Sequence, residues 1–158
     1  YIVDKLILFH INEQMYGINV EFVNAIETVA DIVRVPNAPN YIEGIIHLRG
    51  DVIPVYSLRN KLNLERSNSE KEPQLIITRS GVHVFAFVVD GVDEIYEMNG
   101  GSYIEPPMLL QSEATSYIEG IANVEGKLVL GINVDALMNE TEKDNMKRFV
   151  EQLSQSDQ

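Results

Sequence analysis

The sequence predicts a mainly β protein that contains two copies of one unit. The stretch Tyr41–Leu58 recurs at residues 117–134, where Tyr-Ile-Glu-Gly-Ile is identical and Gly50 coincides with Gly126 at an offset of 76 residues. Short runs of β-branched and aromatic residues alternate with turn residues, which is typical of β-hairpins. Repetition at a fixed offset indicates a duplicated supersecondary unit. The expected architecture is therefore two small, similar subdomains that share packing.

The first copy begins with an expected hairpin. Residues 6–11 are rich in β-forming residues, and residues 15–18 continue as the partner strand after a polar turn. Val20, Val23 and Ile26 then occur three residues apart. That spacing fits either one helical turn or an irregular strand, and periodicity does not decide between them.

Two short helices are expected beside the repeated stretch. Residues 31–36 indicate a strand that two prolines stop, and Asn37 is a suitable N-cap for a helix through residue 43. Gly44 would end that helix in a left-handed conformation. By the same reasoning, a short helix precedes Gly120.

The repeated stretch itself predicts a hairpin with Gly50 and Asp51 in a two-residue turn of type II′. Alternation along the strands gives each copy one aliphatic face, which we expect in the core. These faces consist of Ile46, Leu48, Ile53 and Val55 in the first copy and Ala122, Val124, Val129 and Gly131 in the second. Arg49 and Glu125 occupy equivalent positions, so the buried faces agree while the exposed chemistry differs.

The second copy also begins with a hairpin, which residues 75–89 form around a glycine turn. It matches the first hairpin at an offset of 69 residues, and Val92 and Ile95 then fall on Val23 and Ile26. The change of offset from 69 to 76 means that the second copy contains seven extra residues.

A single domain is expected for residues 1–158. The polar, turn-rich segment 65–73 is the candidate linker, which gives subdomains of about residues 5–70 and 74–138. An amphipathic helix is expected over about residues 140–153, with Thr141 as its cap. Its apolar stripe consists of Met146, Phe149, Val150 and Leu153. We expect the stripe to dock on the protein's own barrel, the alternative being a partner.

Composition argues against several classes of partner. Twenty-four acidic residues against twelve basic ones give a net charge of −12, and the densest basic patch is Arg59, Lys61 and Arg66. Nucleic acids and anionic membranes require clustered positive charge, so neither is an expected partner. The absence of cysteine excludes disulfides and thiolate chemistry, and it is consistent with a reducing compartment. No apolar run approaches the roughly 20 residues of a spanning helix.

No catalytic constellation is complete in the sequence. The three histidines, His10, His47 and His83, lie on expected strands without metal-ligand spacing, so we interpret them as structural. Glu43 and Glu119 occupy equivalent repeat positions and leave a carboxylate-dependent hydrolase as an alternative of a different class. Such an enzyme needs its carboxylates about 5–10 Å apart, and nothing in the sequence indicates that separation. We therefore expect no enzymatic activity, no metal and no cofactor.

Residues 40–59, NYIEGIIHLRGDVIPVYSLR, resemble the signature segment of CheW-like domains, which is close to F-I-x-G-x-x-N-L-R-G-x-x-I-P-V-x-D-L-R. The Tyr-Gly-Ile run at 16–18 and the Val-Val-Asp-Gly-Val run at 88–92 are also similar to that family. The resemblance covers about residues 5–138 in order. This sequence departs from the pattern at His47 and Ser57, and it has Ala25 where an acid is common.

The resemblance implies two small five-stranded SH3-like β-barrels around a shared core. It also implies a non-enzymatic adaptor that couples chemoreceptors to a chemotaxis histidine kinase in a signalling array. The implied partners are the kinase's regulatory domain, which has the same fold, and the chemoreceptor's cytoplasmic signalling tip. The implied location is cytoplasmic, at membrane-associated receptor arrays, without direct membrane insertion. The CheW-like module of a receiver-fused coupling protein is the nearest alternative.

The resemblance also implies which residues meet the partners. Arg49 and Gly50 match the receptor-binding Leu-Arg-Gly segment, and Val23 and Ile26 match positions that line the groove between the subdomains. The implied kinase contact consists of Met108, Leu109 and Leu110.

Two of these assignments have alternatives in the residues themselves. Three consecutive apolar residues in a loop, here 108–110, either enter the core or face a partner. Arg49 either makes directional contacts with a partner or forms a local ion pair, with Asp51 or Glu43 as the acid.

Overall fold

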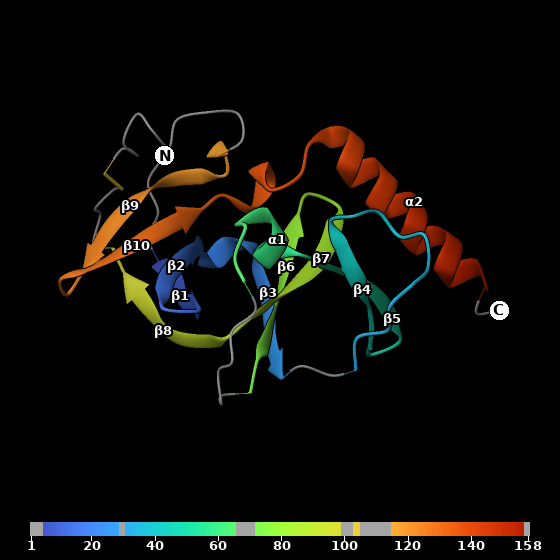
Figure 1. Cartoon of the computed structure of the whole chain (residues 1–158), viewed down its shortest axis with the longest axis horizontal. Coiled ribbons are helices and arrows are strands. Elements are labelled where there is room, and N and C mark those ends of the chain that lie inside the picture. Colours follow the sequence, from blue (N-terminus) through green and yellow to red (C-terminus); the bar gives the residue numbers. More distant parts are fainter. Residues whose placement is uncertain (1–4, 29–30, 66–71, 99–102, 105–114, 157–158) are drawn as a thin grey trace.

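The computed structural model describes residues 5–28, 31–65, 72–98, 103–104 and 115–156. These residues form two five-stranded sheets side by side, with a long helix across one of them (Figure 1). Sheet A contains, in spatial order, β8 (Gly91–Glu97), β1 (Lys5–Ile11), β2 (Gln14–Asn19), β10 (Lys127–Ile132) and β9 (Ile118–Val124). Sheet B contains β3 (Val23–Thr28), β6 (Gln74–Ser80), β7 (His83–Val89), β5 (Asp51–Tyr56) and β4 (Ile42–Leu48). The mainly β fold class with two five-stranded units is confirmed.

Each sheet is shared between the two copies of the repeat. Sheet A joins the first hairpin of copy one to the last three strands of copy two, and sheet B does the reverse. The strand orders become identical when the copies are exchanged. The expected boundary between residues 5–70 and 74–138 therefore does not separate the sheets, because each sheet takes strands from both sides of it. A repeat offset identifies equivalent strands, but it does not determine which copy each strand pairs with.

Three hydrophobic clusters hold this arrangement together. One lies inside the curve of sheet A and another inside sheet B, where the aliphatic faces expected from the repeat are buried. The third and largest cluster takes residues from both sheets. At its centre, Phe9 of β1 and Phe87 of β7 have ring centroids 5.8 Å apart. Because a fully buried phenylalanine contributes about 1.5–3 kcal/mol, this shared core fixes the sheets against one another.

Neither sheet closes into a complete barrel, and glycines explain how each is partly closed. The chain after β3 crosses β4 through an isolated bridge between Val33 and Ile45, and Ile104 bridges Ile121 at the equivalent place. A Cβ atom on Gly44 would lie 2.4 Å from the Val33 carbonyl oxygen. The repeated glycine therefore allows a crossing segment rather than ending a helix. The short helices expected at 37–43 and before Gly120 are wrong.

The repeated hairpins turn one residue earlier than expected. Arg49 and Gly50 occupy the turn with φ angles of 53° and 86°, and Glu125 and Gly126 have 52° and 84°. Positive φ at both central positions defines a type I′ turn, not type II′. Leu48 consequently pairs with Asp51. The pairing differs from expectation by two residues along the partner strand, so each side chain keeps its face and the expected core faces remain correct.

A buried ion pair joins the two sheets near the end of copy one. Arg59 lies on α1 (Leu58–Lys61), after β5, and its Nη2 atom donates to Asp90 Oδ1 at 2.7 Å. Their side chains are 16% and 8% exposed. Arg59 also donates to Asn12 Oδ1 at the β1–β2 turn, and Asp90 accepts from the Asn12 backbone N–H. Arg59 is thus a structural residue, not part of an open basic patch.

Residues 20–28 combine both alternatives that the sequence left open. Val20–Phe22 form a 3₁₀ helix, η1, and the strand β3 follows it with a register shift between Val23 and Ala25. Residues 31–36 contribute only the bridge at Val33 rather than a full strand.

The C-terminal helix α2 (Glu140–Ser156) packs against β5, so the expected docking on the protein's own barrel is confirmed. Its cap is Asn139 rather than Thr141: Asn139 and Glu142 exchange side-chain and backbone hydrogen bonds of 2.8 and 3.0 Å. Tyr41 donates its hydroxyl to the Glu142 carbonyl at 2.9 Å. Among the described residues, no helix has the length and apolar character needed to cross a membrane.

Candidate functional site

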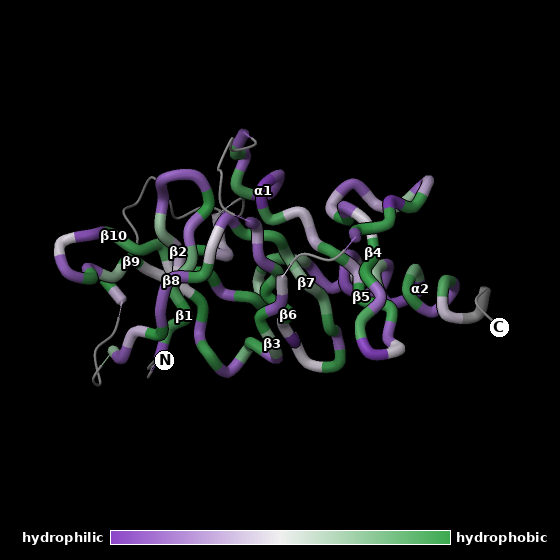
Figure 2. Tube along the Cα trace, turned by 90° about the horizontal axis from the view of Figure 1, so that it is seen from below, coloured by the Kyte–Doolittle hydropathy of each residue, from purple (hydrophilic) through white to green (hydrophobic). Residues whose placement is uncertain are grey.

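Each sheet has a groove beside the tip of its repeated hairpin, and the two grooves are lined by equivalent positions of the two copies. The groove on sheet B, called the arginine groove, has a volume of about 520 Å³. The groove on sheet A, called the acidic groove, has a volume of about 360 Å³. Seven residues of the acidic groove have a counterpart in the arginine groove: His10 (Arg79), Met15 (Val84), Asp93 (Asn24), Glu94 (Ala25), Val124 (Leu48), Glu125 (Arg49) and Lys127 (Asp51). Both hairpin tips are hydrophilic (Figure 2).

The arginine groove brings two cations to an apolar floor. Arg49 stands at the β4–β5 tip, and Arg79 lies near the end of β6, on the same face as Ile77. The floor and walls include the apolar residues Ala25, Leu48, Val52, Ile53, Ile77, Val84 and Val150. Val150 belongs to α2, so the C-terminal helix forms one wall of the groove.

Arg49 forms an ion pair within the chain. Its Nη2 atom donates to Glu27 Oε1 at 3.2 Å, and the two side chains are 78% and 30% exposed. The acid is therefore on β3, and neither Asp51 nor Glu43 is the partner. Because Arg49 remains mostly exposed, this pair leaves its guanidinium accessible to a partner protein.

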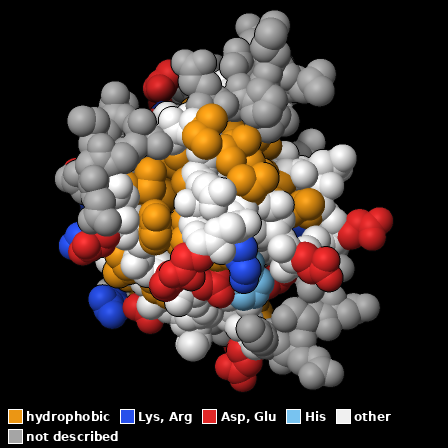
Figure 3. All heavy atoms as spheres, turned by 90° about the vertical axis from the view of Figure 1, so that its left-hand side faces the viewer, with side chains coloured by type: hydrophobic (Ala, Val, Ile, Leu, Met, Phe, Trp, Pro, Cys, Tyr) orange, Lys and Arg blue, Asp and Glu red, His pale blue; other side chains and the backbone are white. Residues whose placement is uncertain are grey.

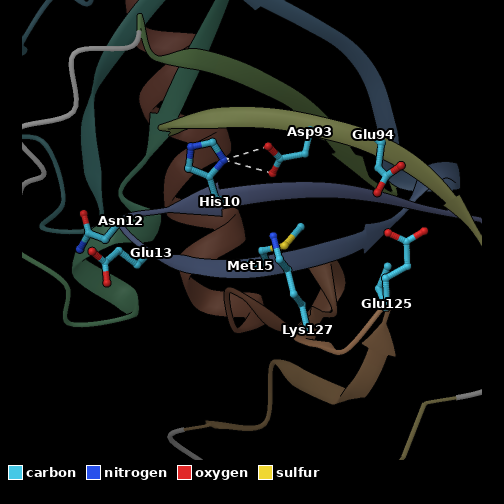
Figure 4. A pocket seen from close by; sticks show the side chains of 9 residues that line it. His10, Asn12, Glu13, Met15, Asp93, Glu94, Glu125 and Lys127 are labelled. Atoms are coloured by element: carbon cyan, nitrogen blue, oxygen red, sulfur yellow. Dashed lines mark hydrogen bonds and ion pairs between the residues drawn. The ribbon is translucent and has the colours of Figure 1, made fainter.

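The acidic groove has the same backbone frame and the opposite chemistry. Figure 3 views this end of the molecule, where acidic side chains surround exposed apolar ones. Glu94 of β8 and Glu125 of the β9–β10 tip point toward one another, and His10 contacts Asp93 at 3.1 Å (Figure 4). The interpretation of His10 as a structural residue is consistent with this contact. No group of three metal-ligating side chains occurs among the described residues.

The receptor-contact residues that the sequence implied lie on two surfaces. Arg49 and Gly50 line the arginine groove. Val23 pairs with Thr78 and Ile26 with Ile76, so both lie on one face of β3, and Val23 packs against the core between the sheets. Val23 is half-buried against that core, whereas Ile26 is 38% exposed. The two surfaces meet at β3, where Glu27 follows Ile26 directly.

The implied kinase-contact residues, Met108, Leu109 and Leu110, lie outside the described residues, and so does most of the linker candidate 65–73. Residues 103–104 are the described part of the chain nearest to the kinase-contact segment. Ile104 is 64% exposed and bridges β9.

The two candidate catalytic carboxylates are not brought together. Glu43 lies on β4, the outer strand of sheet B, and Glu119 lies on β9, the outer strand of sheet A. These strands lie toward opposite ends of the molecule (Figure 1). Glu43 accepts a hydrogen bond from Ser57 at 3.2 Å. Burial raises the pKa of Glu119 to about 7, although a hydrogen bond from Tyr103 opposes the shift. The structure gives the hydrolase alternative no support.

Sequence reasoning did not identify Glu27 or Arg79 as part of the site. Glu27 lies on β3, in a stretch whose helical or strand character was left open, so its face could not be assigned. Arg79 was placed on a strand without reference to Arg49, because pairing between the copies was not anticipated. The offset of 69 residues, which aligns Arg79 with His10, was the available signal.

The fold and the site define a duplicated β-sheet protein with a charged, partly apolar groove at each hairpin tip. Such grooves are suited to contact with other proteins. A family model described as the CheW-like domain matches residues 5–142. The chain therefore belongs to the CheW-like domain family.

Relatives with this family's name cover most of the chain. The chemotaxis protein CheW of Bacillus subtilis strain 168 is 31% identical over 86% of this chain and 87% of its own length. The chemotaxis protein CheW of Klebsiella aerogenes is 24% identical over 87% of this chain and 83% of its own. The crystal structure of the scaffolding protein TtCheW from Thermoanaerobacter tengcongensis is similar, with a TM-score of 0.76 and 28% identity over 87% of this chain and 88% of that one.

Proposed function

We propose that this chain is a non-enzymatic adaptor that couples chemoreceptors to a chemotaxis histidine kinase. The observation that carries the proposal is the family match over residues 5–142, together with relatives whose names specify chemotaxis and a similar structure named as a scaffolding protein. An adaptor needs at least two binding surfaces. Two chemically distinct grooves, each built on the same repeated frame, are consistent with that need.

The receptor's cytoplasmic signalling tip meets two adjoining surfaces, one with Arg49 and Gly50 and the other with Val23 and Ile26. Arg49 offers an exposed planar guanidinium with several donors, which suits directional contact with a protein partner. Ile26 adds exposed apolar area beside Glu27. Charged groups at such a surface determine specificity and association rate, whereas the apolar residues contribute buried area.

The kinase's regulatory domain is the second partner, with Met108, Leu109 and Leu110 as its contact. In this proposal the protein acts in the cytoplasm, at receptor arrays that it reaches through its partners. No cofactor, nucleic acid or direct membrane insertion is part of the proposed role. A CheW-like module within a receiver-fused coupling protein would use the same surfaces.

The proposal is tested by measuring binding of the purified chain to a chemoreceptor signalling tip and, separately, to a kinase regulatory domain. Arg49→Ala is expected to weaken receptor binding about tenfold, because an anchoring arginine commonly contributes 1–2 kcal/mol or more at a protein interface. The free energy of unfolding should change by less than about 0.5 kcal/mol, as for other exposed side chains. Glu125→Ala, the equivalent change at the other tip, is the control. Absence of binding to both partners by the wild-type chain would contradict the adaptor role.

A further inference from the structure

We infer that the arginine groove binds an acidic segment of the receptor tip that also carries an apolar side chain. In the free protein Glu27 pairs with Arg49, and a carboxylate of the bound segment replaces Glu27 in that ion pair. The inference rests on the proposed function and specifies the chemistry of its receptor site. It assigns two further residues to that site: Glu27 as an internal competitor and Arg79 as a second cation.

The Arg49–Glu27 pair has the properties of a replaceable contact. The Arg49 side chain is 78% exposed, and it meets Glu27 through one hydrogen bond of 3.2 Å rather than through a bidentate pair. Exposed ion pairs of this kind contribute little to stability, since water and salt compete with them. A carboxylate from a partner can therefore replace Glu27 on Arg49 at small cost.

Arg79 provides the second cation. It lies in the same groove, near the end of β6, and no hydrogen bond or ion pair to another described residue engages its side chain. Its repeat counterpart His10 is engaged by Asp93 at 3.1 Å. At the arginine groove that acid is absent, because Asn24 stands at the position equivalent to Asp93.

The floor of the groove requires an apolar group in the same segment. Ala25 and Glu27 lie on one face of β3, two residues apart, and Ala25 lines the groove with Ile77 and Val84. Val150 of α2 adds to this apolar lining. A segment with acidic residues alone would leave this area uncovered, whereas an apolar side chain between two carboxylates matches the groove.

The charges that line the groove indicate the charge of the segment that it binds. The chain carries a net charge of −12, so a general attraction for acidic segments is not expected from the molecule as a whole. In the arginine groove, Arg49 and Arg79 outnumber the single acid Asp51, and they provide that attraction locally. The equivalent groove on sheet A has the opposite excess, with Glu13, Asp93, Glu94 and Glu125 against Lys127. An acidic segment is thus directed to one groove and repelled from the other.

The test measures the affinity of the full chain for a chemoreceptor cytoplasmic tip fragment by isothermal titration calorimetry at two salt concentrations. Glu27→Gln should raise the affinity about two- to fivefold, which is the range that an exposed ion pair contributes. Glu97→Gln is the matched control, because Glu97 also forms an exposed ion pair, with Lys5 on sheet A. This substitution changes the net charge by the same amount as Glu27→Gln. Its affinity should equal that of the wild type.

Arg79→Gln should lower the affinity about two- to tenfold and reduce the dependence on salt, as expected of a charge at the rim of an interface. Arg34→Gln removes an exposed arginine outside the groove and is the control. In an Arg49→Ala background, Glu27→Gln should give no further gain, because the contact that it releases no longer exists.

The outcomes separate the inference from the proposed function. If the wild-type chain binds and Arg49→Ala weakens binding, but Glu27→Gln leaves the affinity unchanged or lowers it, Glu27 is no competitor and the inference is overturned. If Glu27→Gln increases self-association instead of receptor affinity, the groove takes a second copy of the chain, which also overturns the inference. If the wild-type chain does not bind the receptor tip at all, the proposed receptor contact itself fails.

Discussion

The two hairpin tips have the same backbone and opposite chemistry. Arg49-Gly50 and Glu125-Gly126 adopt type I′ turns whose φ angles differ by a few degrees. One tip presents a cation over an apolar floor, whereas the other presents a carboxylate beside Glu94. The glycines are kept because only they adopt the larger positive φ without strain. The preceding residue is free to differ, and it gives the two tips opposite charges.

The interiors of the two sheets show a second kind of divergence. At Gly131 of sheet A, an added Cβ atom would lie 2.3 Å from the Tyr103 ring. The equivalent position in sheet B is Val55, and its neighbour is the smaller Ile32. A tyrosine with a glycine thus fills the space that an isoleucine with a valine fills in the other copy. A large residue beside a glycine in sheet A thus corresponds to two medium-sized residues in sheet B.

The largest expected effect comes from the ion pair that joins the sheets. Asp90→Asn removes the charge that compensates Arg59, which is 16% exposed, and should lower the free energy of unfolding by about 3–5 kcal/mol. Urea-induced unfolding followed by circular dichroism measures this change. Asp93→Asn removes the more exposed acid that contacts His10 and should cost less than about 1 kcal/mol. Equal effects of the two changes would show that Arg59 does not link the sheets.

The exchange of side-chain volume between the sheets gives the next largest effect. Gly131→Val should destabilise the chain by about 1–3 kcal/mol, because the new side chain overlaps Tyr103. Combining it with Tyr103→Ile copies the packing of sheet B. The double variant should be at least about 0.5 kcal/mol more stable than the sum of the single changes predicts. Additive costs in urea unfolding would reject this account of the two interiors.

A smaller effect concerns pH and is confined to sheet A. Burial raises the folded-state pKa of Glu119 to about 7, above its ordinary value of 4.5. The protonated carboxyl is therefore favoured by folding, so its stabilising contribution is full below pH 4.5 and is lost as the pH rises through 7. Glu119→Gln should raise the melting temperature at pH 8 relative to the wild type. It should also reduce the fall in melting temperature that the wild type shows between pH 5 and pH 8.

Glu43→Gln removes the carboxyl at the equivalent position of sheet B and is the control for the loss of one charge. Thermal unfolding of the wild type and both variants at pH 5, 6, 7 and 8 provides the comparison. If the melting temperature of Glu119→Gln falls with pH as much as that of the wild type, another group is responsible for the fall.

The sequence was sufficient for features that depend on local patterns. The repeat follows from sequence identity at a fixed offset, and the alternating core faces and the amphipathic helix follow from side-chain periodicity. Each is present in the structure. The family resemblance supplied the five-stranded units. The type of turn at Arg49-Gly50 was missed because a glycine can occupy either central position, and only the pairing of Leu48 with Asp51 determines which.

Features that depend on contacts between segments distant in the sequence could not be predicted. Gly44 looked like a helix stop, since the crossing of Val33 over its bare Cα is visible only in three dimensions. The partner of Arg49 was sought nearby in the sequence, whereas Glu27 lies on a strand that reaches Arg49 through the curvature of sheet B. The sequence of one hairpin alone does not indicate that its strands pair with strands of the other copy.

The central claim is that function resides in the side chain at one tip and that the repeated frame is common to both. The most direct test exchanges the tips in one double variant, Arg49→Glu with Glu125→Arg, which keeps the net charge at −12. We expect the free energy of unfolding to stay within about 1 kcal/mol of the wild type, because both positions are exposed turn residues. Affinity for the receptor signalling tip should fall at least about tenfold, since a carboxylate then faces the acidic segment. An unchanged receptor affinity in a variant that remains folded would contradict the account.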